Sequence, residues 1–586
     1  MRCFLQTCIK RILLPSTLQI GSTHHFPTIF MKPFSSQELY ASNVKIGELA
    51  RAGNIQAARQ LFDKMTTKDV VTWNAIITGH WQNGFLEESK ILFQIMPVKN
   101  IVSWNSMIAG CIENEKIDQA LDYFRATPKR NTASYNAMVS GFVKYGRIEE
   151  ASRLFEEIPR KNVISYTAII DGYMKIGEVD KARALFDYMR CKNVVSWTVM
   201  ISGYVENGRF DEARVLFGEM PESSKNVVAF TAMIMGYCKE GMVENARYLF
   251  ERIQKKDLVS YNAMISGYAQ NGAGEKALSL YSKMLGMGMQ PDQATLVSVF
   301  TACSALASLT AGRQTHAFVI RNGFGTNVSV CNALITMYSK CGSILESELA
   351  FRDIHTPDTV SWNTIIAAFA QHGLYEKALK FFSQMTLNGF EPDWITFLSL
   401  LSACGHAGKV KESTYLFDLM VKDYGIVPRS EHYACLVDIL SRAGELEKAC
   451  QIIQVMPFEA DTAVWGAILA ACNIYLNVEL AELAAKKIRD LDPHSSGPYV
   501  MLSNIYAASG MWREVTRVRI LMKEQQVKKQ RAYSWMEIDN KMHYFLGGDI
   551  SHLDTDEIYL ELKRVSLHMK CMDDIAEIVS SWRIFD

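Results

Sequence analysis

The sequence predicts an all-α protein, built as a right-handed superhelical solenoid of stacked helix-turn-helix repeats. The first observation is a fixed period, because Asn43, Asn74, Asn105 and Asn136 are each 31 residues apart within similar segments. The second is that each period holds two apolar stretches with helical spacing. The third is a glycine between the two stretches in most periods. Repetition at a period of this size indicates a stacked array rather than one globular core.

The unit from Val70 to Asn100 shows how one repeat is predicted to fold. Apolar residues from Val70 to His80 recur three or four positions apart, as they would on one face of a helix. Gly84 follows where a helix end favours a residue with positive φ. A second helix begins near Leu86, and its small residue Ser89 allows the paired helices to approach closely. One hairpin cannot bury its apolar face alone, so neighbouring units must stack.

Composition agrees with a folded array and excludes several classes of protein. The 586 residues are 49% hydrophobic and 21% charged, and Lys+Arg equals Asp+Glu at 62 each. No global charge therefore indicates a nucleic-acid partner. The 13 cysteines lack paired spacing and are predicted to be reduced thiols. No apolar run approaches the roughly 20 residues of a membrane span, so we expect no membrane association.

Residues 1–37 differ from the rest of the chain. They contain Arg2, Lys10, Arg11 and Lys32, with Ser and Thr interspersed, and the first acidic residue is Glu38. A basic, acid-free leader of this kind is typical of an organelle transit peptide, and a frayed N-terminus is the alternative. Arg2 and the apolar residues 12–14 favour the mitochondrion over the chloroplast.

The repeated segments, such as VVTWNAIITG at 70–79 and VVSWTVMISG at 194–203, resemble pentatricopeptide repeats of the plant PLS subclass. The resemblance covers residues 38–461, as about 13 repeats of short, standard and long types. Residues 462–530 hold two further predicted hairpins that resemble the family's E extension motifs. Residues 531–564 resemble its E+ segment, in which MHYFLGG (542–548) favours a small hairpin. The tail at 565–586 is unassigned. Tetratricopeptide repeats, with a 34-residue period, are the nearest rival.

The resemblance implies that two positions of each repeat contact bases of single-stranded RNA, one base per repeat. We call the Asn or Thr on the first helix the marker and the Asp or Asn that ends the repeat the final residue. The pairs are Asn43 with Asp69, Asn74 with Asn100, Asn105 with Asn131, Asn136 with Asn162, Thr167 with Asn193, Thr198 with Asn226, Thr231 with Asp257, Asn262 with Asp292, Asn332 with Asp358, and Asn363 with Asp393. Aliphatic residues three positions before the marker share its helix face and would flank the base. These are Val71, Val102, Ile164, Val195, Val228, Val259 and Val360.

The family's recognition code, carried over pair by pair, implies a provisional target. Asn–Asp pairs resemble uracil readers, Asn–Asn pairs pyrimidine readers, Thr–Asn pairs adenine readers, and the Thr231–Asp257 pair a guanine reader. The long and last short units place Val297, Leu398 and Ala434 at the marker, and these side chains cannot hydrogen-bond a base. The implied site is U-Y-Y-Y-A-A-G-U-x-U-U-x-x.

Structural roles compete with base recognition at some of these positions. Asn or Asp directly before a helix is a standard N-cap, so capping alone could explain the final residues. The aromatic residues beside the markers, such as Trp73 and Tyr261, are predicted to pack in the core. Asn and Thr are poor residues for a helix interior, so packing does not explain the markers.

No catalytic motif stands out, and we expect no enzyme activity, cofactor or metal. Related deaminase domains hold zinc through H-x-E and C-x-x-C motifs. Here no H-x-E follows Asp461 and no C-x-x-C occurs, while His543, His552, His568 and Cys571 are not spaced as a tetrahedral zinc site.

The resemblance therefore implies a site-recognition factor for C-to-U editing of a mitochondrial transcript. It would recruit a deaminase-bearing partner of the DYW type, or other editing factors, through residues 462–564. An RNA stability or splicing factor that acts by occupying its site is the alternative. A tetratricopeptide-like protein scaffold is a third hypothesis, and binding assays with RNA and peptide pools would separate it from the other two.

Overall fold

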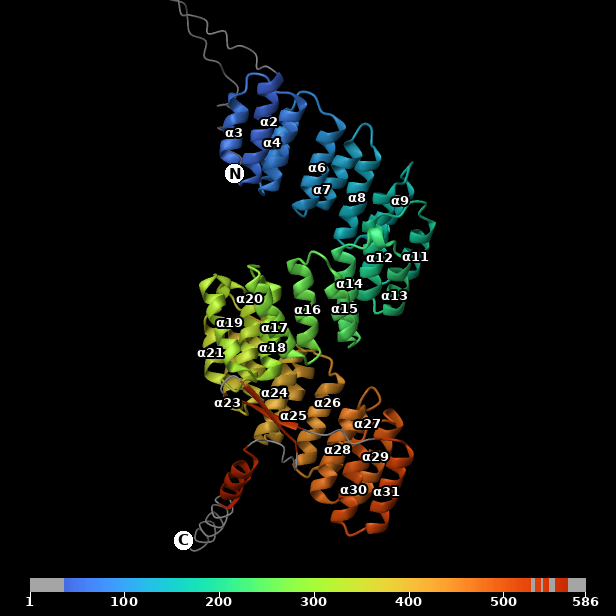
Figure 1. Ribbon diagram of the computed structural model, residues 1–586, viewed down its shortest axis with the longest axis vertical. Coiled ribbons are helices and arrows are strands. Elements are labelled where there is room, and N and C mark those ends of the chain that lie inside the picture. The colour runs from blue at the N-terminus through green and yellow to red at the C-terminus, as the bar shows by residue number, and fades with distance from the viewer. Residues whose placement is uncertain (1–35, 528–532, 539–540, 547–553, 568–586) are drawn as a thin grey trace, which may run out of the picture. The chain divides into compact units, whose positions relative to one another are not determined.

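The computed structural model describes residues 36–527, 533–538, 541–546 and 554–567, which are almost entirely helical (Figure 1). The chain divides after Ala229 into two compact units. Helix α14 (Val227–Lys239) contains the point of division. The leader predicted at 1–37 lies outside the described residues except for its last two, because helix α2 begins at Ser36.

The first unit is a succession of helical hairpins with short connections. Its helices are α2 (Ser36–Arg51), α3 (Ile55–Lys64), α4 (Val70–Gln82), α5 (Leu86–Ile95), α6 (Ile101–Glu113), α7 (Ile117–Ala126), α8 (Thr132–Lys144), α9 (Ile148–Glu156), α10 (Val163–Lys175), α11 (Val179–Tyr188), α12 (Val194–Glu206), α13 (Phe210–Glu219) and the 3-10 turn η1 (Glu222–Ser224).

The second unit continues the same pattern and adds a small sheet. Its helices are α15 (Val243–Arg252), α16 (Leu258–Gln270), α17 (Gly274–Gly286), α18 (Gln293–Leu306), α19 (Leu309–Arg321), η2 (Phe324–Thr326), α20 (Val328–Lys340), α21 (Ile344–Arg352), α22 (Thr359–Gln371), α23 (Tyr375–Leu387), α24 (Trp394–Ala407), α25 (Val410–Lys422), α26 (Ser430–Arg442), α27 (Leu446–Val455), α28 (Thr462–Tyr475), α29 (Val478–Leu491), α30 (Gly497–Ala508) and α31 (Trp512–Glu524).

In each of the two compact units, the helices of the repeats form two layers. The first helices of consecutive repeats pack on one another, from α2 through α12 in the first unit and from α16 through α28 in the second. Each second helix packs against the first helix of its own repeat and that of the next, as α3 does against α2 and α4. This arrangement confirms the predicted all-α solenoid of helix-turn-helix repeats.

Glycine and small residues allow this close stacking. Gly84 adopts φ +84° at the end of α4, as its position predicts. Gly172 faces the preceding repeat, where an added Cβ would lie 2.7 Å from a methyl group of Val143. Ala182 and its counterparts on the other second helices, Ser89 among them, are fully buried. The close spacing between helices therefore requires residues with small side chains or none at these contacts.

The aromatic residues beside the markers pack between repeats, as predicted. Trp73 contacts Phe62 of the preceding second helix edge to face, with ring centroids 4.9 Å apart. Tyr261 and Phe250 meet in the same way at 5.2 Å. Edge-to-face pairs of this kind stabilise beyond their buried area. The rings thus join consecutive repeats and are not available for base stacking.

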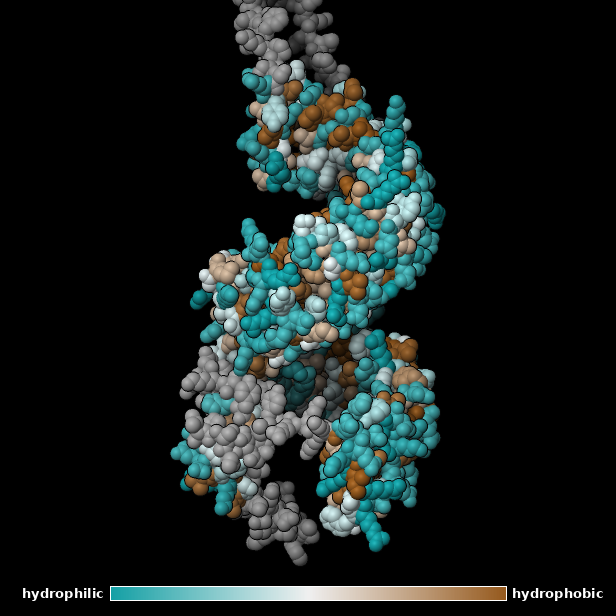
Figure 2. Space-filling view, turned by 45° about the vertical axis from the view of Figure 1, so that its right-hand side comes forward, coloured by the Kyte–Doolittle hydropathy of each residue, from teal (hydrophilic) through white to brown (hydrophobic). Residues whose placement is uncertain are grey.

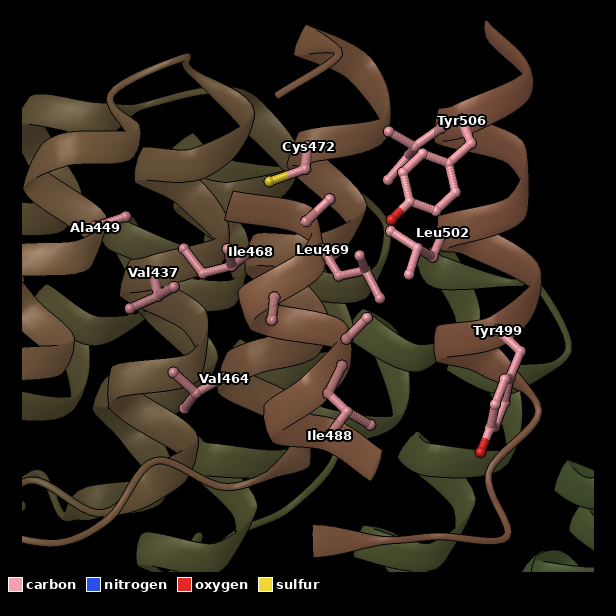
Figure 3. Packing of buried hydrophobic residues seen from close by; sticks show 14 of the residues in the cluster. Val437, Ala449, Val464, Ile468, Leu469, Cys472, Ile488, Tyr499, Leu502 and Tyr506 are labelled. Atoms are coloured by element: carbon pink, nitrogen blue, oxygen red, sulfur yellow. The ribbon is translucent and has the colours of Figure 1, made fainter. Parts of the chain in front are cut away.

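The apolar core does not stop where the repeat pattern ends at Asp461. Val437 of the last repeat lies in one cluster with Val464 and Ile468 of α28, and this cluster continues to Leu502 and Tyr506 of α30 (Figure 3). The two hairpins predicted after residue 462 are confirmed as α28–α29 and α30–α31. The array and its extension therefore share one core.

Beyond these hairpins the described residues form a two-stranded antiparallel sheet and a short helix. Strand β1 (Tyr533–Ile538) pairs with β2 (Lys541–Leu546). A small hairpin thus forms at the predicted segment, with residues 542–546 in its second strand, while the two glycines on which the prediction rested, at 547–548, lie outside the described residues. Residues 555–567 form a helix whose side chains are largely exposed. None of the helices in the described part of the chain combines the length and apolarity needed to cross a bilayer.

Candidate nucleic-acid interface

In five junctions between repeats, the marker bonds directly to the final residue with which the sequence pairs it. Asn262 donates from Nδ2 to Oδ1 of Asp292 at 2.9 Å, and Asn363 donates to Asp393 at the same distance. Asn136 donates to Oδ1 of Asn162 at 3.1 Å. Similar bonds join Asn43 to Asp69 at 3.3 Å and Asn332 to Asp358 at 3.5 Å. In these five junctions, side chains 26 or 30 positions apart in the sequence thus form one polar pair.

The final residues also form the N-cap of the next helix, so one side chain can both cap a helix and pair with a marker. Oδ1 of Asp292 accepts the backbone N–H of Thr295, and Oδ1 of Asn162 accepts that of Ser165. The same N-cap bond occurs at Asp69, Asn100, Asn131, Asn193, Asn226, Asp257, Asp358 and Asp393. Each carboxylate or amide is held at a helix N-terminus with its second polar atom remaining for another partner.

A third side chain, which the sequence analysis missed, completes the junction. It is the Ser or Thr at the third position of the next first helix, and we call it the N3 hydroxyl. Thr295 donates from this hydroxyl to Oδ1 of Asn262 at 2.6 Å, and Ser165 donates to Oδ1 of Asn136 at 2.6 Å. The only sequence signal was its recurrence three positions after nine of the ten final residues, with Ala229 after Asn226 as the exception, and this recurrence also fits a capping box.

Asn and Thr markers present opposite hydrogen-bonding groups to the surface. In the Asn262 junction the amide oxygen accepts from Thr295 and one amide hydrogen goes to Asp292, so the second amide hydrogen is a donor. Thr167 uses its hydroxyl hydrogen on the backbone oxygen of Val163 at 2.7 Å. Its oxygen therefore remains an acceptor. Thr198 makes the same bond to Val194.

The aliphatic side chains three positions before the markers are largely exposed and contribute little to the core. Val71, Ile164 and Val259 are 59–62% exposed, and Val102, Val195, Val228 and Val360 are exposed to a similar degree. The space-filling view shows such hydrophobic residues scattered over an otherwise hydrophilic surface (Figure 2). Their exposure agrees with the prediction that they flank a bound group.

One junction encloses a cavity of about 280 Å³ that contains the predicted contact residues. Asn363 and Asp393 line it, together with Val360, Lys340 and Ile395 of the next first helix. Ile395 occupies the same helix position as Val360 but was not singled out by the sequence pattern. Two aliphatic side chains and a polar pair that line one pocket suit a flat heteroaromatic group.

Three final carboxylates are held in their ionised form. Partial burial of Asp292 raises its pKa, but hydrogen bonds from the Thr295 backbone and hydroxyl and from Asn262 outweigh burial and lower the pKa below its ordinary value. The same balance lowers the pKa of Asp69 and of Asp358. These side chains therefore act as acceptors at neutral pH.

These lowered pKa values predict a loss of stability in acid. The stabilising contribution of each carboxylate is complete above the ordinary pKa of 3.8 and is lost as the pH falls through the lower folded value. We expect the unfolding temperature, measured by circular dichroism, to fall below about pH 4. In the control Asp292→Asn, which still caps the helix but carries no titrating group, the decline should be smaller. Identical acid profiles would contradict this assignment.

The described residues contain no group of three or more His, Cys, Asp and Glu side chains placed to hold a metal ion. Of the four residues considered for zinc, only His543 lies among them, whereas His552, His568 and Cys571 lie outside the described residues. The cysteines in the described part of the chain are thiols, and Cys111, Cys238 and Cys472 are among the buried ones.

Stacked hairpins, with polar pairs that recur at several of their junctions, define a helical-repeat solenoid. The model of the PPR repeat family matches residues 161–194, 256–305 and 357–406, and that of the PPR repeat matches 46–70, 71–101, 102–131, 133–163, 195–224, 228–258 and 395–424. These matches together cover more than half of the chain, which belongs to the pentatricopeptide repeat family. An E motif matches residues 475–537, within the region predicted as the extension.

Individual relatives agree with this assignment. The Arabidopsis thaliana pentatricopeptide repeat-containing protein At1g20230 is 42% identical over 283 residues, which are 48% of this chain and 37% of the relative. The chloroplastic protein ELI1 of the same plant is 42% identical over 50% of this chain and 46% of its own length. The match thus spans less than half of these curated relatives.

Solved structures show the same fold. The crystal structure of the pentatricopeptide repeat protein PPR10 in complex with an 18-nt psaJ RNA element aligns with a TM-score of 0.50 and 20% sequence identity. The alignment covers 84% of this chain and 80% of PPR10.

Proposed function

We propose that this chain binds single-stranded RNA along its first-helix layer, with one base at each junction between repeats. The observation that carries the proposal is the cavity that is lined both by the polar pair Asn363–Asp393 and by the aliphatic side chains of Val360 and Ile395. A base inserted there would lie between Val360 and Ile395 with its edge toward the amide and carboxylate. PPR10, which shares the fold, was solved with an RNA element bound.

The hydrogen-bonding groups at each junction support the base assignments that the family code implies. An Asn–Asp pair offers one donor and one acceptor, which match a carbonyl oxygen and the N3–H of uracil. An Asn–Asn pair offers two donors, which suit the N3 and O2 acceptors of cytosine. A Thr–Asn pair offers an acceptor and a donor, which match N6–H and N1 of adenine. The same logic gives a Thr–Asp pair two acceptors for the N1–H and N2–H donors of guanine.

The base assignment can be tested by changing one marker. Thr167→Asn replaces an acceptor by a donor beside Asn193, so preference at that nucleotide should shift from adenine to a pyrimidine. The expected change in the binding free energy difference between the two bases is roughly 1–3 kcal/mol, as for other base-edge contacts. Asn and Thr have similar helix propensities, so the melting temperature should change little. Filter binding with single-stranded RNAs that differ at one nucleotide measures the shift.

A duplex of the preferred sequence is the control, and it should bind poorly because pairing hides the base edge. Equal weakening of all single-stranded RNAs by Thr167→Asn would contradict base recognition at the markers. Binding of peptide pools in place of RNA would favour a protein scaffold.

We further propose that the chain acts as the site-recognition factor for C-to-U editing of a mitochondrial transcript, with the deaminase supplied by a separate protein. The E motif at 475–537 supports the editing role, and residues 462–564 would recruit the deaminase-bearing partner. Relatives of this chain include proteins named mitochondrial and proteins named chloroplastic. The basic, acid-free leader favours the mitochondrion. Sequencing of organellar RNA from plants that lack the protein would identify the edited site.

A further inference from the structure

We propose that the N3 hydroxyl is a specificity-determining positioning residue: it holds the marker amide so that its N–H, and not its oxygen, faces the base. The inference rests on the proposed RNA binding and concerns a residue that does not itself touch the base. The side chains of Ser165 and Thr295 are fully buried below the surface on which the markers lie.

In four junctions the N3 hydroxyl lies closer to the marker oxygen than to the final residue, and Thr72 is 2.7 Å from both. Ser165 lies 2.6 Å from Oδ1 of Asn136 and 3.0 Å from Oδ1 of Asn162. Thr396 lies 2.5 Å from Oδ1 of Asn363 and 3.1 Å from Oδ1 of Asp393. Similar bonds to the marker occur from Thr72 to Asn43, from Ser134 to Asn105 and from Thr295 to Asn262.

The direction of the hydroxyl follows the type of marker. In the repeat that follows the one with marker Thr167, Ser196 donates to the backbone oxygen of Asn193 at 2.9 Å. Ser260, which follows the repeat of marker Thr231, donates to the backbone oxygen of Asp257 at 2.8 Å. Every repeat with an Asn marker is followed by Ser or Thr at this position: Thr72, Ser103, Ser134, Ser165, Thr295, Ser361 and Thr396.

Two Asn markers show what the bond supplies. Ser103 and Ser361 bond to the final residue, and in these junctions Oδ1 of Asn74 and Oδ1 of Asn332 are buried without a hydrogen-bond partner among the described residues. A buried acceptor without a donor is unfavourable. A donor to this oxygen removes that penalty, so the N3 hydroxyl stabilises the oxygen-inward orientation in the junctions where it bonds to the marker.

An Asn amide that turns by 180° exchanges its donor and acceptor. With the hydroxyl present, turning would break both the bond from Ser165 and the bond to Asn162. Without the hydroxyl of Ser165, the amide oxygen of Asn136 has no donor in the interior. Turning this oxygen toward the base then costs only the bond between Asn136 and Asn162. The turned amide would accept a hydrogen bond from the amino group of adenine, so discrimination against adenine would weaken.

The test compares two buried serines in neighbouring repeats. Ser165→Ala and Ser196→Ala each remove a fully buried hydroxyl from a capping box, with Asn162 or Asn193 as the N-cap. Only the first removes a bond to a marker. In filter binding, Ser165→Ala should lower the ratio of pyrimidine to adenine affinity at the nucleotide opposite Asn136 about fivefold, as for loss of one hydrogen bond. Ser165→Thr, which keeps the hydroxyl, should restore the ratio.

Ser196→Ala should lower the melting temperature as much as Ser165→Ala while leaving base preference unchanged at the nucleotide opposite Thr167. If Ser165→Ala binds RNA with an unchanged ratio, or if both variants lower discrimination equally, the positioning role is overturned and RNA binding stands. If the unaltered chain shows no base preference at any position, the proposed function fails and the positioning role fails with it.

Discussion

A chain cut after Asp461 should be less stable in its last repeat, by roughly 5 kcal/mol or more, than a chain cut after Val527. The reason is the shared core, in which α26 packs against α28 and Val437 lies beside Val464 and Ile468 (Figure 3). The cut at 461 exposes several large apolar residues of α26, and each buried residue of this size contributes about 1.5–3 kcal/mol. Repeat arrays also need a terminal unit with a polar outer face.

The two truncations separate stability from function. Limited proteolysis and thermal unfolding should detect early opening near residues 430–461 only in the shorter chain. The chain that ends at Val527 keeps all helical hairpins, so it should bind RNA like the full chain. Under the proposed recruitment through residues 462–564, the chain cut after Asp461 should fail to support editing in the organelle. Editing by this shorter chain would contradict recruitment through residues 462–564, and equal stability of both truncations would contradict the shared core.

Trp362→Ala should lower the free energy of unfolding by about 3–5 kcal/mol, the usual range for truncating a large buried aromatic residue. Trp362 is 5% exposed and contacts Phe351 edge to face, with ring centroids 4.8 Å apart. It also packs against Phe381 and Phe390. Although it directly precedes the marker Asn363, it belongs to the packing between repeats. Base preference opposite Asn363 should therefore not change.

Trp362→Phe is the matched control, because it keeps an aromatic ring at the contact with Phe351. It also removes the buried indole N–H, which has no hydrogen-bond partner among the described residues. The stability of this variant, followed by urea unfolding, should remain close to that of the native chain. A change of base preference in either variant would show that the aromatic residue contacts RNA.

The repeat architecture was predictable from the sequence because its causes are local. Apolar spacing defines each helix, and a glycine with positive φ, such as Gly84, follows the end of most first helices. The pairing of Asn262 with Asp292 was expected for a different reason. The recognition code of the family that the repeats resemble pairs these two positions.

Other features depend on contacts that no single repeat contains. The direction of a hydroxyl such as Ser165 or Ser196 depends on whether an Asn oxygen from the preceding repeat lies within reach. Ile395 became part of the cavity only when α24 was placed beside α22.

The sequence by itself determined the helices, their caps and the positions of the markers, because these follow from periodicity and from interactions within a few residues. Only the tertiary structure decided which atoms of each marker are already bonded, and therefore which remain to meet a base. It also decided that the core continues from Val437 through α28 to Tyr506, although the repeat pattern stops at Asp461. Apolar faces pack against any complementary neighbour, so a change of sequence motif need not be a boundary in the fold.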